Sequence, residues 1–358
     1  MELIVERKRR RRLSGHNAAV PAPHATTPDA PLLEVSNLRV TLNTPRGVAD
    51  ALRGIDFSLN AGATLGLIGE SGCGKSMTAL ALMGLLPDGA QASGSIRLNG
   101  QELIGLDDTA MCRLRGHRLA MIFQEPMTAL NPLHTVGHQV AEPLRLHKGL
   151  SPPEARAESL RLLDRVQLPN AAQRLDAYPH QLSGGQRQRV MIAMALACGP
   201  DLLIADEPTT ALDMTIQAEI LDLIDDLARD TGMALLLISH DLRMMARSVE
   251  RLLVMYGGMV IESGPTAEVF AHLAHPYTRG LYAARPRLGS PRVNGRKPPL
   301  ATIPGRVPEL IDLPLGCPFA DRCNWVIGAC RAAPPAALHV GPGHEARCIR
   351  LDHIGAPA

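Results

Sequence analysis

The segment at residues 69–76 constrains this chain more than any other, and it reads Gly-Glu-Ser-Gly-Cys-Gly-Lys-Ser. It matches in full the phosphate-binding loop pattern G-x-x-x-x-G-K-S/T. An apolar run at 63–68 precedes it and a helix-like run at 77–83 follows it, which is the strand–loop–helix setting that the pattern requires. The sequence therefore predicts a nucleoside triphosphate site built from Gly69, Glu70, Ser71, Gly72, Cys73, Gly74, Lys75 and Ser76.

Each part of this loop has a physical task in holding phosphate. The glycines reach backbone angles closed to residues with a Cβ and let amides approach phosphate oxygens. The helix that begins near Lys75 points its free N–H groups and the positive end of its dipole at the same anion. We expect Lys75 to reach the terminal phosphates, Ser76 to hold Mg²⁺, and Cys73 to make the site sensitive to thiol reagents.

Composition bounds the other classes of function. A chain of 358 residues has room for about two domains. With 37 Lys and Arg against 35 Asp and Glu, the net charge is +2, so the chain as a whole is not a polyanion binder. The basic block at 7–12 could contact anionic lipid or nucleic acid, but the prolines that follow favour a solvated, disordered tail over residues 1–31.

Nothing in the sequence predicts a membrane span or a secretion signal. No apolar stretch approaches the roughly 18–20 residues that a spanning helix needs. The run Met1–Val5 is too short for a signal-peptide core and lies on the wrong side of the basic block. We therefore expect a cytosolic protein that acts on a membrane only through partners.

Two kinds of strand are predicted. Alternating apolar residues at 33–42, 55–59 and 96–98 indicate an antiparallel, half-buried layer. The nearly all-apolar runs at 65–69, 119–124, 202–206 and 234–239 indicate a parallel sheet covered on both faces. Residues 132–182 are predicted helical, 251–262 a hairpin turning at Gly257-Gly258, and the proline-rich stretch from about 264 a separate appendage.

The apolar strand at 202–206 ends in two acids, Asp206 and Glu207. A strand of this kind delivers its terminal carboxylate to the ligand-binding edge of a parallel sheet. Asp206 is then expected to orient Mg²⁺, and Glu207 to act as general base on the attacking water. The alternative is an acidic pair that caps a helix.

The segment Leu182–Arg189 reads Leu-Ser-Gly-Gly-Gln-Arg-Gln-Arg, and its first five residues resemble the signature of the ATPase subunits of ABC transporters. Physically it is a second anion site, with a serine helix cap and glycines that allow close backbone approach. The resemblance implies that this site, Ser183, Gly184, Gly185 and Gln186, faces the γ-phosphate held by an opposite subunit. Two ATP molecules would be sandwiched in a head-to-tail pair, so pairing would be obligatory.

Other positions match the same family one by one. Gln124 resembles the glutamine that senses Mg²⁺ and the attacking water, and His240 resembles the histidine that contacts the γ-phosphate. Ala211-Leu212-Asp213 resembles the loop that crosses the dimer interface, which adds Asp213 to the expected nucleotide site. One departure is visible: no aromatic residue precedes Asp56 to stack on adenine, so Val48 is expected to supply apolar contact and preference for ATP over GTP is less strict.

Four cysteines crowd the C-terminal part: Cys317, Cys323, Cys330 and Cys348. A cytosolic chain does not normally keep disulfides, which favours metal binding. The spacing of five, six and seventeen intervening residues fits no zinc-ribbon pattern, and zinc, an iron–sulfur cluster and free thiols all stay open.

Four further segments, 123–132, 275–280, 303–305 and 316–323, resemble the peptide and nickel importer ATPases, and the likeness runs from about 32 to 348. It implies an α/β fold: a P-loop NTPase (RecA-like) core at 32–265 with an antiparallel β subdomain and a helical subdomain at about 132–182. A small irregular C-terminal extension would occupy 266–358. In some members the four cysteines hold a four-iron four-sulfur cluster, which we expect here in a structural role.

The expected function is ATP hydrolysis that energises import of di- or oligopeptides. The resemblance implies a second, similar ATPase subunit, two membrane-spanning permeases docked near 133–146, and an extracytoplasmic substrate-binding protein. A hetero-pair of ATPase subunits is favoured, and pairing with a copy of the same chain stays open. The protein would lie at the cytoplasmic face of the inner or plasma membrane. Nickel or glutathione import stays open within the family. A soluble ATPase acting on ribosomes or nucleic acid is disfavoured, because the chain has one set of motifs and no heptad run.

Overall fold

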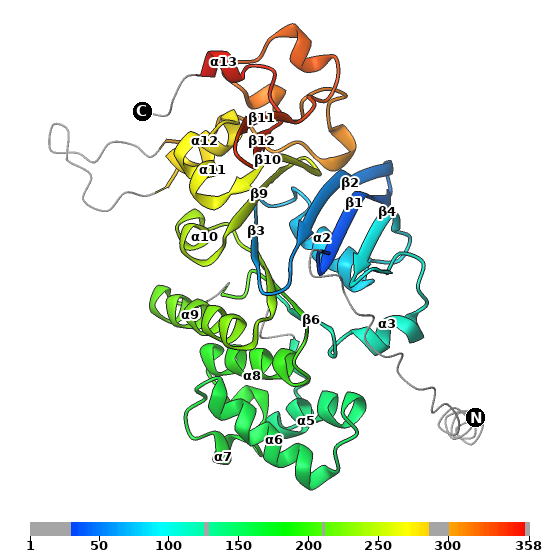
Figure 1. Ribbon diagram of the computed structural model, residues 1–358, viewed down its shortest axis with the longest axis vertical. Coiled ribbons are helices and arrows are strands. Elements are labelled where there is room, and N and C mark those ends of the chain that lie inside the picture. Colours follow the sequence, from blue (N-terminus) through cyan, green and yellow to red (C-terminus); the bar gives the residue numbers. More distant parts are fainter. Residues whose placement is uncertain (1–29, 125–128, 210–211, 286–300, 355–358) are drawn as a thin grey trace, which may run out of the picture. The chain divides into compact units, whose positions relative to one another are not determined.

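The computed structural model describes residues 30–124, 129–209, 212–285 and 301–354, and the described residues from 31 onward belong to one compact unit. The basic block at 7–12 and part of the segment 123–132 lie outside the described residues. Figure 1 shows the chain passing from an antiparallel β layer through a mixed central sheet to the C-terminal extension. This arrangement is the predicted α/β architecture.

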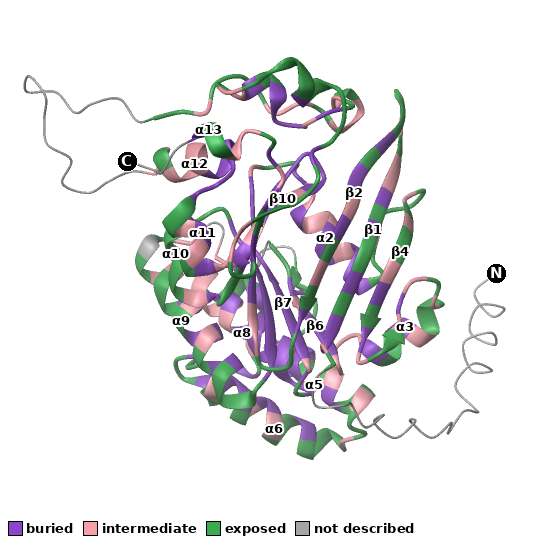
Figure 2. Cartoon of the chain, turned by 45° about the horizontal axis from the view of Figure 1, so that its top comes forward, coloured by how far each residue is buried: buried purple, intermediate pink, exposed green. Residues whose placement is uncertain are grey.

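The antiparallel layer is built from strands β1 (Leu33–Thr44), β2 (Gly47–Leu59), β4 (Gln91–Leu98) and β5 (Gln101–Glu102), in the order β2-β1-β4-β5. Buried and exposed residues alternate along β1 and β2, as Figure 2 shows. The alternation slips where the register shifts between Val35 and Leu38, because Asn37 adopts a left-handed φ of 46°. The predicted strands are confirmed, and they are longer than the sequence indicates.

The central sheet holds the predicted parallel strands β3 (Thr64–Ile68), β6 (Leu119–Ile122), β7 (Leu202–Asp206) and β8 (Ala234–Ile238). Its order is β11-β12-β10-β9-β3-β8-β7-β6, with parallel pairing from β9 to β6. Every residue of β7 and β8 is buried, as an apolar strand covered on both faces requires. The predicted hairpin is confirmed as β9 (Arg251–Tyr256) and β10 (Met259–Pro265).

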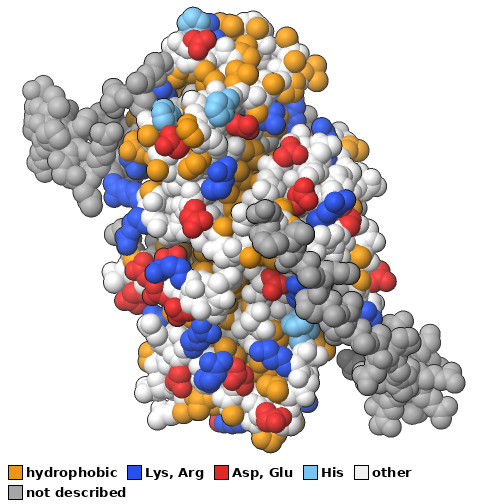
Figure 3. All heavy atoms as spheres, viewed as in Figure 1, with side chains coloured by type: hydrophobic (Ala, Val, Ile, Leu, Met, Phe, Trp, Pro, Cys, Tyr) orange, Lys and Arg blue, Asp and Glu red, His pale blue; other side chains and the backbone are white. Residues whose placement is uncertain are grey.

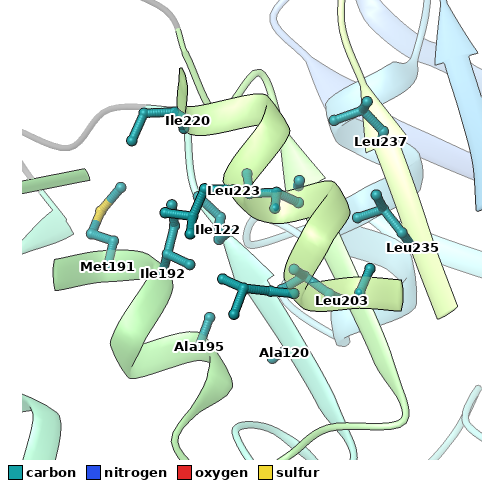
Figure 4. Packing of buried hydrophobic residues seen from close by; sticks show 14 of the residues in the cluster. Ala120, Ile122, Met191, Ile192, Ala195, Leu203, Ile220, Leu223, Leu235 and Leu237 are labelled. Carbon is teal, nitrogen blue, oxygen red and sulfur yellow. The ribbon is translucent and has the colours of Figure 1, made fainter. Parts of the chain in front are cut away.

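Helices cover the sheet where their apolar stripes meet it. Figure 4 shows α8 (Gly184–Leu196) and α9 (Met214–Thr231) directing Ile192 and Leu223 toward Ile122 of β6 and Leu203 of β7. The ends of α9 follow from its sequence, since Asp213 caps the first turn and Gly232 closes the last in a left-handed conformation. On the side of the antiparallel layer lie α2 (Lys75–Met83) and α3 (Asp108–Leu114).

The predicted helical region contains α5 (Val136–His147), α6 (Pro152–Arg165), α7 (Ala171–Arg174) and the 3₁₀ turn η1 (Pro179–Gln181). Ser151 and Glu154 form a capping box at the start of α6, and proline occupies its first position. Helix α8 packs against both α5 and α6, so the signature segment begins beside this helical layer.

The C-terminal extension does not form the separate appendage that the sequence predicts. Its strand β12 (His344–Ala346) pairs with β10, and β11 (Leu338–Gly341) pairs with β12, so the central sheet continues into the extension. The buried Glu262 side chain of β10 accepts hydrogen bonds from the N–H groups of Ala274 and His275, and one of its oxygens lies 2.9 Å from His344 Nε2. Local proline density could not reveal this long-range pairing.

The remaining elements are short. They are α10 (Leu242–Ser248), α11 (Thr266–His272), α12 (Pro276–Ala283), η2 (Leu310–Asp312), η3 (Ala320–Arg322), η4 (Gly328–Arg331) and α13 (Leu351–Ile354). Figure 3 shows hydrophobic side chains at the surface over the extension, and Leu315 is the most exposed of the large ones, at 85%. Within the parts of the chain that the structure describes, no helix combines the length and apolarity needed to cross a membrane.

Candidate nucleotide site

The phosphate-binding loop joins β3 to α2, as the sequence predicts. Lys75 is 6% exposed, and its Nζ donates to the carbonyl oxygens of Gly69 at 2.8 Å and Glu70 at 3.1 Å. These bonds fold the lysine back over the loop and shape it as a cradle. Gly74 caps α2 with a φ of 108° and no side-chain hydrogen bond, so no side chain competes for the first amides of the helix.

Two glycines of the loop are required for different reasons. A Cβ on Gly69 would lie 2.3 Å from the Met255 carbonyl oxygen, so this position must be glycine for the loop to pass over β9. Gly72 has a φ of 81°, and a Cβ there would meet nothing within 4 Å. The backbone at Gly72 therefore faces open space, which a close approach of phosphate oxygens requires.

The burial of Cys73 argues against the thiol sensitivity that the sequence predicts. Its side chain is 1% exposed, and burial raises the pKa of its thiol. The thiolate is the reactive form of cysteine, so a buried thiol of raised pKa is a poor nucleophile. The residue fills the small space beneath the loop.

Ser76 and Asp206 meet at the start of α2 and the end of β7, where the sequence predicts Mg²⁺. The side chains of these two residues are hydrogen-bonded, and Asp206 Oδ1 is buried without a partner in the described residues. Burial raises the pKa of Asp206; the Ser76 contact opposes this effect, and the carboxylate of Glu207 adds to it. An unsatisfied carboxylate oxygen beside a hydroxyl fits Mg²⁺, which binds through a few protein oxygens and keeps waters and phosphate oxygens.

Glu207, Gln124 and His240 come together at the same edge of the sheet, from the ends of β7, β6 and β8. Glu207 Oε2 lies 3.3 Å from Gln124 Nε2 and 3.4 Å from His240 Nδ1. Glu207 has a φ of 45°, a strained conformation that costs roughly 1–3 kcal/mol and is typical of functional sites. The hydrogen bond to Glu207 raises the pKa of His240. If Asp206 and Glu207 served only to cap a helix, the contacts of Glu207 with Gln124 and His240 would have no explanation.

The signature segment and the interface loop both act as helix caps. Ser183 accepts from the Gln186 N–H at 3.3 Å, and Gln186 Oε1 accepts from the Ser183 N–H, which forms a capping box. A Cβ on Gly184 would lie 3.3 Å from the side chain of Leu212, which precedes α9. A Cβ on Gly185 would lie 3.0 Å from the side chain of Ile216 in α9. Asp213 accepts from two amides of α9. Ala211 lies outside the described residues, and the interface role of this loop stays a prediction.

The segment expected to contact adenine is tied to the extension. Val48 is 65% exposed, and Arg46 pairs with Glu309 at 2.8 Å and Asp312 at 2.7 Å. A Cβ on Gly47 would contact Ile311. The tip of the β1–β2 hairpin thus rests on η2, and Val48 leaves an apolar side chain open to a base.

Sequence reasoning missed two residues that hold the phosphate-binding loop from the extension. The Glu70 N–H donates to the Tyr277 hydroxyl of α12 at 2.7 Å. Arg322 of η3 donates to both carboxylate oxygens of Glu70, at 2.6 and 3.1 Å. No local pattern could have identified them, because the partners lie 207 and 252 positions apart in the sequence.

The structure brings the four C-terminal cysteines together around one small cavity: Cys317, Cys323, Cys330 and Cys348. Burial raises the pKa of Cys317 to about 11, and the neighbouring thiols add to the effect. The Arg350 N–H donates to Cys348 Sγ at 3.4 Å. Within the described ranges, however, no group of three or more His, Cys, Asp or Glu side chains is arranged to hold a metal ion.

A phosphate loop, an acidic strand end and a signature helix on this fold define an ATP-binding cassette. Residues 52–210 match the ABC transporter family, and residues 261–330 match the oligopeptide/dipeptide transporter C-terminal region. Among solved structures, the dimeric cassette MJ0796 in a post-hydrolysis state bound to ADP and Pi is 28% identical. It has a TM-score of 0.60 and covers 65% of this chain and 98% of its own.

The curated relatives extend the likeness over most of the chain. The oligopeptide transport ATP-binding protein OppD of Salmonella typhimurium is 48% identical over 329 residues, 92% of this chain and 96% of that protein. OppD of Haemophilus influenzae is 49% identical over 304 residues, 85% of this chain and 93% of that protein. The chain belongs to the ABC transporter ATPases, in the branch with the oligopeptide/dipeptide C-terminal region.

Proposed function

We propose that this ATPase energises the import of di- or oligopeptides through partner permeases. The observation that carries the proposal is the C-terminal region: it matches the oligopeptide/dipeptide family, and it is built into the same sheet as the ATPase core. Relatives named for oligopeptide transport cover nearly the whole chain. The proposed location of the protein is the cytoplasmic face of the inner or plasma membrane, where it would be a peripheral protein.

In the proposed reaction, water attacks the γ-phosphate in line with the leaving oxygen. Lys75 would neutralise charge on the phosphates, and Ser76 and Asp206 would hold Mg²⁺, which would supply further positive charge there. Glu207 accepts the proton of the attacking water, with Gln124 and His240 orienting the carboxylate and the γ-phosphate. The proposal is supported by the contacts that Glu207 makes with both residues, 3.3 and 3.4 Å apart. Replacing Glu207 by glutamine should slow turnover by roughly 10²–10⁴.

The signature site of one chain is proposed to complete the phosphate site of a second. The signature helix α8 packs with α5, α6 and α9, whereas α2 belongs to the hydrophobic cluster of the antiparallel layer. The phosphate-binding loop therefore leads into α2 in one hydrophobic cluster, and the signature segment begins α8 in another. The partner would be a similar, non-identical ATPase subunit arranged head to tail, with Asp213 near the shared interface. The dimeric cassette MJ0796 supports such pairing by analogy.

The permeases are proposed to dock beside the helical layer. A largely apolar groove lies between β6, α5 and α8, lined among others by Leu85, Phe123 and Met191. Leu133 precedes α5 and is 81% exposed, and Leu146 lies in the last turn of α5 and is 72% exposed. These side chains would receive a permease segment, while other faces of the same helices pack in the core. An extracytoplasmic binding protein would supply cargo, and no nucleic-acid contact is proposed.

We propose a structural four-iron four-sulfur cluster for the four-cysteine cavity. The support is the donor set alone, since the four thiols line one cavity and an amide donates to Cys348 sulfur. Among the described residues the four thiols are not arranged as the ligands of a metal ion, so cluster binding would have to draw them closer together. The cluster would tie η3, η4 and the segment after β12 together. Protein purified without oxygen should contain iron and absorb light at about 400 nm. A preparation with neither would remove the cluster from the proposal.

The importer proposal is tested by purifying a Glu207→Gln variant from membranes with ATP present and identifying what accompanies it. Slowed hydrolysis should hold a paired ATPase closed, and Lys75→Ala is the matched control, because it should not retain ATP. Recovery of multi-span permeases and a second ATPase with Glu207→Gln supports the proposal and identifies the transport system. Recovery of ribosomes or nucleic acid without permeases overturns it.

A further inference from the structure

We infer that Arg322 is a positioning residue for the phosphate-binding loop: it neutralises Glu70 and holds that carboxylate away from the bound phosphates. The inference concerns nucleotide affinity and does not depend on which cargo is imported. Arg322 contacts the phosphate-binding loop through the Glu70 carboxylate, so it would act on nucleotide through that side chain.

The need for such a residue follows from the loop's own chemistry. Glu70 places a carboxylate inside a loop whose amides and lysine are built to hold a polyanion. Like charges a few ångströms apart repel strongly where water is partly excluded, and the Glu70 side chain is 27% exposed. A cationic partner that neutralises Glu70 would therefore favour triphosphate binding to the loop.

Arg322 meets that requirement with a fixed geometry. Its guanidinium makes a two-pronged contact with Glu70 and is 5% exposed. It also donates to the Pro304 carbonyl oxygen at 2.8 Å and to the Tyr256 hydroxyl at 3.2 Å. An arginine with this many fixed partners cannot swing toward the nucleotide, so it holds Glu70 in place rather than binding phosphate itself.

A buried aromatic cluster makes the support rigid. The rings of Tyr256, Tyr277 and Phe319 lie 4.7 to 5.4 Å apart, and they come from β9, α12 and the extension. Tyr277 accepts the Glu70 N–H from the same cluster. The loop residue is thus held at its backbone by Tyr277 and at its side chain by Arg322, both outside the core match to the ABC family at 52–210.

The test is a charge-rescue cycle on the full chain, with MgADP binding measured by calorimetry. Arg322→Gln should weaken MgADP binding about tenfold, since it leaves Glu70 uncompensated beside the phosphates. Adding Glu70→Gln to that variant should restore affinity to within about twofold of the parent, because the repelling charge is then absent. Arg331→Gln, which breaks the exposed Arg331–Asp321 pair in the same extension, should leave affinity unchanged.

Each outcome decides the matter. Unchanged affinity in Arg322→Gln overturns the inference. Weakened affinity that the second substitution does not rescue also overturns it, because a merely structural role for Arg322 would give that result. If Arg322→Gln fails to fold, Arg322→Lys takes its place: lysine keeps a positive charge beside Glu70, so MgADP affinity should fall by less than about threefold. A loss of about tenfold or more in Arg322→Lys would overturn the inference.

Discussion

Replacing Glu262 by alanine would remove the acceptor that ties the extension to the central sheet. Glu262 is 1% exposed and accepts from the N–H groups of Ala274 at 2.8 Å and His275 at 2.9 Å, while His344 Nε2 lies 2.9 Å from its carboxylate. The substitution leaves three buried donors without a partner. The extension should therefore loosen before the ATPase core does.

The size of the effect follows from the number of donors. A buried donor left unsatisfied costs about 1–3 kcal/mol, so three of them should lower the free energy of unfolding of the extension by at least about 3 kcal/mol. Glu262→Gln keeps one acceptor oxygen and should cost less than half as much. The difference between the two variants measures the lost hydrogen bonds apart from the lost side-chain volume.

The chain provides its own reporter for this assay. It contains one tryptophan, Trp325, which lines the four-cysteine cavity of the extension. Urea titration followed by Trp325 fluorescence reports the extension, and far-UV circular dichroism reports the whole chain. Glu262→Ala should move the fluorescence midpoint to lower urea and separate it from the circular dichroism midpoint.

The matched control is Glu345→Ala, which removes an exposed carboxylate next to His344 on the same strand. It should leave both midpoints in place. A loss below about 1 kcal/mol in Glu262→Ala, the worth of one ordinary hydrogen bond, would refute the reasoning.

Three further predictions follow from the titratable groups. The contact with Glu207 raises the pKa of His240 above 6.5, so the charged pair exists below that raised pKa and is lost as pH rises through it. NMR titration should show a lower His240 pKa in Glu207→Gln, and an unchanged pKa would contradict the assignment. Iodoacetamide should label the exposed Cys112 before the buried Cys73, which peptide mass spectrometry would show; the reverse order would mean that the loop opens. Burial lowers the pKa of His275 to about 4, so stability should rise with pH from 4 to 6.5, and urea midpoints in His275→Gln should lose that slope.

Much of the fold could be predicted because its signals are local. The all-apolar runs of β7 and β8 predict strands buried on both faces, and the glycines of the phosphate loop predict a turn that only they allow. The residues at the ends of β6, β7 and β8 meet because the carboxyl ends of parallel strands share one edge. The family resemblance singled out Gln124 and His240, and their places at the ends of β6 and β8 explain why they meet Glu207.

The parts that could not be predicted depend on contacts between distant segments. The pairing of β12 with β10 leaves no periodic pattern, because β12 is three residues long. Arg322 lies in a proline- and cysteine-rich stretch whose composition indicates irregular structure, and nothing there marks Glu70 as its partner. The burial of Cys73 under the loop likewise depends on β9, so exposure could not be judged from its neighbours in sequence.

The place of β3 in the central sheet sets the order in which the nucleotide site can be completed during protein synthesis. β3 lies between β8 and β9, whose residues are 234–238 and 251–256, although β3 itself is residues 64–68. The strand that carries the phosphate loop therefore leaves the ribosome long before either neighbour exists. Until residue 238 has emerged β3 lacks both partners, and until residue 256 has emerged it still lacks β9; Glu70 must wait longer still, for Arg322. The apolar strand β3 therefore stays without its full set of sheet partners while most of the chain is translated, and this exposure is a consequence of the topology.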